Sequence, residues 1–149
     1  CIYDDVVGLG GMNHFLLPTT ADDRTSVISD TSRFGNQAME LLINELLKRG
    51  AARRRLKAKF FGGADMLGNE NAVGHQNIEF VRKYSAEEGL DVVSEALGGD
   101  RARMVRFWPH SGRALVRCVG TSRSLQREEA QHLQSVLAHQ KDEGDIELF

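Results

Sequence analysis

The chain has 149 residues, of which 41% are hydrophobic and 27% charged, a composition typical of one soluble globular domain. Nineteen Lys and Arg against 21 Asp and Glu leave a formal charge of −2, which argues against generic nucleic-acid binding. The longest uncharged stretch, residues 6–21, contains glycines and a proline and is shorter than the roughly 20 apolar residues of a membrane-spanning helix. We therefore expect no nucleic-acid partner and no membrane insertion.

The two cysteines, Cys1 and Cys118, form neither a disulfide framework nor a paired metal-binding motif. Such usage is typical of a reducing compartment, so we expect a cytoplasmic protein. The five histidines show no metal-ligand spacing, and we expect no metal and no cofactor. The first residue is not Met, which we interpret as a processed end or a cut through a longer protein.

Hydrophobic periodicity predicts the elements of the first half of the chain. Residues 9–17 alternate in the manner of a strand that begins at a Gly-Gly corner, and the polar run 19–32 reads as a surface loop. Apolar residues then recur at helical spacing over 34–49, with Gly50 placed to end the helix in a left-handed conformation. Residues 56–61 alternate again and predict a strand.

The second half is predicted to hold one long helix and several short strands. The helix covers about 76–88 with Gly89 as its stop, and a last helix begins at Ser124 within a C-terminal helix and tail of residues 122–149. Mixed helices and strands indicate an α+β domain. Turn residues separate three strands that we expect to form an antiparallel meander, over 90–97, 103–108 and 113–119.

Three features admit a chemical role beside a structural one. His14 follows the Gly10-Gly11 corner, where a strand histidine is either a structural residue or a catalytic base. The Gly62-Gly63 pair either packs tightly or lets the backbone approach a ligand and donate to an oxyanion. The seven cations between Lys48 and Lys59 form either a solvated surface or a surface for an acidic protein partner.

Several separated motifs occur together in one order along the chain. They are residues 10–18 (GGMNHFLLP), 33–39 (RFGNQAM), 59–66 (KFFGGADM), 74–77 (GHQN), 97–103 (LGGDRAR) and 111–113 (SGR). In this order, they resemble the CheD family of chemoreceptor glutamine deamidases, and the resemblance runs from Cys1 to about Val119. The final residues 144–149 (GDIELF) are similar to endings of some members.

The resemblance implies a cytoplasmic amidohydrolase that converts glutamines on the helical rods of chemoreceptors to glutamate by a Cys-His thioester mechanism. It implies His14 as the catalytic histidine and a pocket shaped by Gly10, Gly11, Asn13 and the Gly62-Gly63 loop. The implied fold is a β-sandwich of largely antiparallel or mixed sheets with helices on one outer face. A CheC-type phosphatase is an implied partner, and the alternative is a non-catalytic adaptor that binds this phosphatase or receptor helices.

The nucleophile expected from the resemblance is missing from these 149 residues. Cys1 matches the family's second, non-catalytic cysteine, and the nucleophile belongs four positions before it, after a Gly-Ser step. We therefore interpret residues 1–149 as a single CheD-like domain that lacks its N-terminal strand or strands, and we expect this fragment to be inactive by itself.

Overall fold

The computed structural model describes residues 1–17, 27–65 and 73–119, and of residues 27–32 it describes only the helical backbone. The described residues all lie in one compact unit, Cys1–Val119. No helix among them is both long and apolar enough to cross a membrane. Its elements in chain order are β1 (Ile2–Asp4), β2 (Leu9–Gly11), α1 (Val27–Lys48), the 3-10 turn η1 (Arg53–Arg55), β3 (Lys57–Gly62), α2 (Val73–Glu88), β4 (Asp91–Leu97), β5 (Arg103–Trp108) and β6 (Arg113–Cys118).

The strands form two sheets. The larger has the order β2-β1-β3-β4, in which β1 pairs antiparallel with both β2 and β3, and β3 pairs parallel with β4. Helix α2 connects β3 to β4, as a parallel pair requires a crossover. Strands β5 and β6 form a separate antiparallel hairpin. The described part of the chain is thus a mixed α+β fold.

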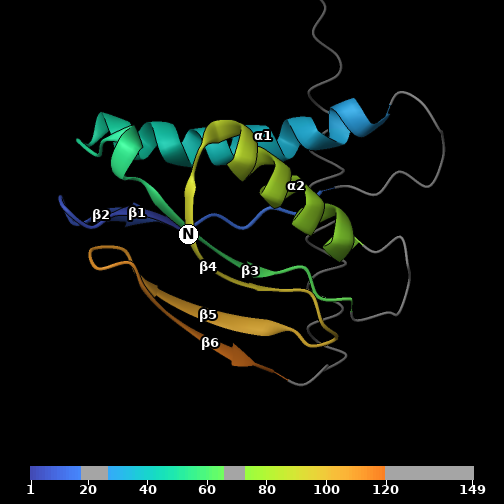
Figure 1. The fold of residues 1–149 in the computed structure, drawn as a ribbon. Helices are drawn as coiled ribbons and strands as arrows, with labels where there is room; N and C mark the ends of the chain where they lie inside the picture. The colour runs from blue at the N-terminus through green and yellow to red at the C-terminus, as the bar shows by residue number, and fades with distance from the viewer. Residues whose placement is uncertain (18–26, 66–72, 120–149) are drawn as a thin grey trace, which may run out of the picture. The chain divides into compact units, whose positions relative to one another are not determined.

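Strand β1 is covered on both faces, because successive side chains of a strand point in opposite directions. Ile2, 1% exposed, belongs to the core beneath the helices, whereas the ring of Tyr3 packs edge-on against Phe107 of β5, with 6.2 Å between ring centroids. In Figure 1 both helices lie on one side of the four-stranded sheet and the hairpin lies on the other. The helices therefore cover one face of the larger sheet.

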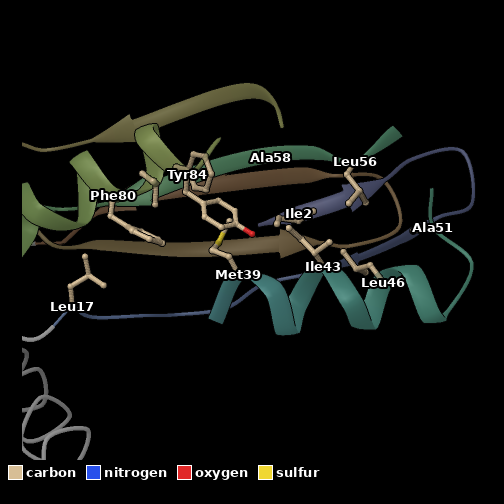
Figure 2. Close-up of a cluster of buried hydrophobic side chains, with 12 residues drawn as sticks. Ile2, Leu17, Met39, Ile43, Leu46, Ala51, Leu56, Ala58, Phe80 and Tyr84 are labelled. Atoms are coloured by element: carbon tan, nitrogen blue, oxygen red, sulfur yellow. The ribbon is translucent and has the colours of Figure 1, made fainter. Parts of the chain in front are cut away.

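The core joins the inner faces of both helices to the middle of the four-stranded sheet. Figure 2 shows the α1 side chains facing the strands, with Met39 beside Tyr84 of α2. Gly50 and Gly89, which follow the two helices, have φ values of 107° and 61°, so the predicted glycine stops are confirmed. The buried apolar cluster consists of Ile2, Leu17, Met39, Ile43, Leu46, Ala51, Leu56, Ala58, Phe60, Phe80, Val81 and Tyr84.

The predicted strand over 9–17 is too long, and the predicted loop over 19–32 is partly wrong. The strand ends at Gly11, which pairs with Ile2, and the next residues bond to the helices instead of to a ladder. Helix α1 already begins at Val27, so its first turns contain the polar residues assigned to a loop. Ser, Thr and Asp are common near helix N-termini, which explains how a helix starts in a polar run. Residues 19–26 lie outside the described residues.

The predicted meander of the last three strands is also wrong. All three strands exist within about one residue of their expected bounds, but β4 pairs parallel with β3 and only β5 and β6 form a hairpin. The chain leaves the large sheet at Gly98 and Gly99, whose φ values of 74° and 79° permit a sharp turn. The helix expected from Ser124 lies outside the described residues, so the single-domain prediction for 1–149 stays a prediction.

Candidate active site around His14

His14 is exposed and lies on an irregular segment, residues 12–17, that two asparagines tie to the helices. Asn13 Nδ2 donates a hydrogen bond to the Ala38 carbonyl of α1 at 2.9 Å. At the far end, the Leu17 backbone N–H donates to Asn77 Oδ1 of α2 at 3.0 Å. His14 is therefore an exposed residue on a backbone held at both ends.

Packing adds to these two hydrogen bonds. Phe15 meets Phe80 of α2 edge-on, with 5.4 Å between ring centroids and 77° between ring planes. This geometry is a favourable one for aromatic pairs. Leu17 is 3% exposed, which buries the end of the segment in the core. Side chains on either side of His14 thus fix the segment on which the histidine stands.

The glycine corner before His14 is required by close packing. A Cβ on Gly10 would lie 2.7 Å from the Pro109 carbonyl oxygen and 2.8 Å from Tyr3 Cβ, and a Cβ on Gly11 would overlap Leu42 of α1. Only glycine lets the strand pass between these neighbours. The glycine corner therefore fixes the path of the backbone that leads to His14. Direct contact of the corner with a substrate stays a prediction.

The Gly62-Gly63 corner is held by hydrogen bonds and by α2. The Gly62 carbonyl accepts from Gly98 N–H at 2.9 Å and from Arg103 Nη1 at 3.3 Å. A Cβ on Gly63 would lie 2.6 Å from Ile78 Cγ1 and 2.9 Å from the Gly74 carbonyl oxygen. Tight packing thus accounts for Gly63. Both this corner and the His14 segment lie against the first half of α2.

A buried carboxylate fixes the other end of the β1–β2 hairpin. Asp4 is 0% exposed, and its oxygens accept hydrogen bonds from Arg55 Nε at 3.0 and 3.1 Å, from Ala52 N–H at 3.0 Å and from Val6 N–H at 3.1 Å. The hydrogen bonds from Arg55, opposed by desolvation, lower the pKa of the Asp4 carboxyl from 3.8 to about 2. Asp4 is therefore a structural anion that joins β1 to η1.

Sequence reasoning singled out His14 and Asn13, whose roles stay predictions, and gave no role to Asn77 or Asp4. Asn77 is the last residue of the GHQN motif and lies in the first turns of α2. This position was the only sequence signal that Asn77 could bond to a neighbouring segment, as it does to Leu17. Asp4 follows two apolar residues that predict a buried strand. A carboxylate in a buried strand needs a buried partner, so this pattern was the available signal for Asp4. Among the described residues, no cluster of three or more His, Cys, Asp or Glu is placed to hold a metal ion.

The family model for CheD chemotactic sensory transduction matches residues 16–118. The chain belongs to the CheD family. It is 40% identical to a Hahella chejuensis protein named "Probable chemoreceptor glutamine deamidase CheD", over all of this chain and 72% of the relative. Proteins of the same name from Cereibacter sphaeroides and Caulobacter vibrioides are 43% and 44% identical, again over the whole chain and over 70% and 78% of the relatives. The whole-chain matches to these CheD relatives include the His14 segment.

Proposed function

We propose that this CheD-family chain deamidates glutamine side chains of chemoreceptors to glutamate in bacterial chemotaxis, with His14 as its catalytic base and acid. The observation that carries the proposal is the placement of His14. Its side chain is exposed, while Asn13 and Asn77 hold the backbone on both sides of it. A catalytic group held within a narrow range of positions meets the orientation requirement of a proton-transfer step.

The proposed reaction proceeds through a thioester. The imidazole of His14 takes the thiol proton, the thiolate attacks the glutamine carboxamide carbon, and a C–S bond forms. The C–N bond then breaks, and the imidazolium gives its proton to the departing ammonia. In the second half, water attacks the thioester carbon and the imidazole takes its proton. The C–S bond breaks and the imidazolium returns the proton to the leaving thiolate, which restores the thiol and the imidazole. The new carboxylic acid loses its proton to water and becomes glutamate.

The thiol in this proposal is neither Cys1 nor Cys118. Cys1 directly precedes β1 and its carbonyl accepts a hydrogen bond from Lys59 N–H at 2.9 Å. Its place in the family pattern is that of the second, non-catalytic cysteine. Cys118 is exposed at the end of β6. By the resemblance, the nucleophile is a cysteine four positions before Cys1, so a test of turnover uses a gene product that contains this position.

The remaining expectations from the resemblance are part of the same proposal. Gly10, Gly11, Asn13, Gly62 and Gly63 would shape the pocket, mostly by fixing the backbone. The hairpin and the four-stranded sheet would form the two layers of a β-sandwich, which is supported by the Tyr3–Phe107 contact. We further propose a cytoplasmic location, with receptor helices as substrate and a CheC-type phosphatase as partner.

Mass spectrometry of a receptor substrate tests the proposal. Each converted glutamine gains about one dalton because OH replaces NH₂, whereas binding without turnover leaves the mass unchanged. We expect the full-length gene product to give this gain and the 149-residue chain to give none. If the full-length product converts no receptor glutamine under conditions where it binds the receptor, the chain is a binding protein without this activity.

A further inference from the structure

The outer face of the β5–β6 hairpin has an alternating pattern of arginine and apolar side chains. In the register of the hairpin, each of three cross-strand pairs on this face combines one arginine with one apolar residue. We call this surface the Arg–apolar face, and it consists of the pairs Met104–Arg117, Arg106–Leu115 and Trp108–Arg113.

The opposite face of the hairpin is the one that contacts the large sheet. Phe107 packs on Tyr3, and Arg103 donates a hydrogen bond to the Gly62 carbonyl. Because residues alternate between faces, the Arg–apolar face points away from these contacts. Met104 is 55% exposed and Leu115 is 48% exposed. These apolar side chains are not used in packing the hairpin on the sheet, and both stay exposed.

Positive charge on this face is not neutralised within the described part of the chain. Residues 101–118 contain five arginines and no Asp or Glu, although the whole chain has a net charge of −2. Arg106, Arg113 and Arg117 form no salt bridge with a described residue. Arg113 lies over the Trp108 ring, 5.0 Å from its centroid, and Arg117 Nη2 lies 3.8 Å from Met104 Sδ.

Most of the cations between Lys48 and Lys59 are paired with carboxylates. Arg55 pairs with Asp4, Lys57 with Asp5 and Arg53 with Glu88. The arginines of the hairpin therefore provide the stronger attraction for an acidic partner. The face also combines Arg, Trp and Met, which are residue types enriched at protein interfaces.

We propose that the Arg–apolar face docks an acidic, amphipathic helix of the protein substrate, a proposal that rests on the proposed function for the nature of that substrate. The face is six residues long, or roughly 20 Å, and therefore matches about 13 residues of a helix. Carboxylates on the helix would pair with the arginines, and its apolar residues would cover Met104 and Leu115.

Two observations favour a protein helix over a nucleic acid. The apolar side chains between the arginines have no counterpart on a phosphate backbone, and the Trp108 ring is already covered by Arg113, which limits stacking of a base. Six side chains are fewer than the roughly 20–30 residues per side of a stable interface, so the contact is expected to be weak and transient.

Fluorescence anisotropy with a labelled cytoplasmic rod of a chemoreceptor tests the docking face. We expect Arg106→Glu, and independently Arg117→Glu, to raise the Kd about tenfold, since each replaces an attraction by a repulsion. Arg106→Lys should retain most of the affinity. Arg54→Glu is the matched control, because Arg54 is exposed, lies outside the hairpin and forms no salt bridge with a described residue. Circular dichroism melting confirms that each variant is folded.

Equal Kd values for the folded Arg106→Glu, Arg117→Glu and Arg54→Glu variants would overturn the proposal. It is also overturned if the parent chain binds RNA, anionic vesicles or a second copy of itself through the same arginines and the rod shows no dependence on them. The readout is binding and not ammonia release. If the full-length gene product binds a receptor through this face without deamidating it, the proposed function is contradicted and the docking surface is left intact.

Discussion

Replacement of Gly112 by Ala tests how the hairpin is docked on the large sheet. Gly112 is buried in the β5–β6 turn with φ = 67°, and a Cβ at this position would overlap the Tyr3 ring. The ring has little room to move, since Tyr3 is 6% exposed and contacts Phe107 and the Lys59 ammonium. We expect the overlap to force the hairpin away from β1.

The expected loss in the free energy of unfolding of Gly112→Ala has two parts. A non-glycine residue in the left-handed region costs about 1–2 kcal/mol, and the overpacked contact adds about 1–3 kcal/mol. Gly89→Ala isolates the first part, because Gly89 has φ = 61° and a Cβ at this position would meet nothing within 4 Å. The free energy of unfolding should therefore fall by about 1–2 kcal/mol in Gly89→Ala and by about 2–5 kcal/mol in Gly112→Ala.

Urea denaturation followed by circular dichroism measures both losses. In a Tyr3→Ala background the ring that a Cβ at position 112 would overlap is gone. Gly112→Ala should then lower the free energy of unfolding no more than Gly89→Ala does, which gives a coupling energy between positions 3 and 112 of about 1–3 kcal/mol. If both glycine variants lower the free energy of unfolding of the parent chain equally, Gly112 is not packed tightly against Tyr3.

Two further predictions concern hydrogen bonds of the site region. The folded-state pKa of Asp4, about 2, lies below its ordinary 3.8, so the carboxylate stabilises the fold above about pH 4 and this contribution is lost as the pH falls from about 4 to 2. The free energy of unfolding measured against pH should fall more steeply over this window in the parent than in Asp4→Asn, and parallel curves would contradict the assignment. Asn77→Ala removes the acceptor of the Leu17 N–H and should lower the free energy of unfolding by about 1 kcal/mol, with faster hydrogen exchange at the Leu17 amide. An unchanged exchange rate at Leu17 would show that Asn77 does not hold the segment.

Local pattern was sufficient for most elements of the fold. The spacing of Leu42 and Leu46 with a glycine after the helix predicts α1 through its C-terminus, because that face packs on the sheet at a period of 3.6 residues. The alternation before Gly62 likewise predicts β3. Sheet partners were not predictable in this way, because β4 shows nothing locally that distinguishes a parallel pairing with β3 from an antiparallel pairing with β5.

Long-range contacts account for what sequence reasoning missed at the site. The length of the strand before His14 depends on Asn13 reaching Ala38 and on Asn77 reaching Leu17, contacts that span 25 and 60 positions of the chain. The glycine corner made His14 a candidate and the family resemblance implied its catalytic role, whereas the tethering of its segment to two helices is visible only in three dimensions. The partner of Asp4, Arg55, is likewise 51 positions away.

Turnover and binding of a His14→Ala variant, measured in the same full-length preparation, test whether His14 is the catalytic group. Asn13 and Asn77 hold the segment on both sides of this exposed residue, so we expect the variant to fold and to bind the receptor. We predict that the one-dalton gain on receptor glutamines is abolished while receptor binding persists. Glutamine conversion at the parent rate would show that His14 has no part in the mechanism.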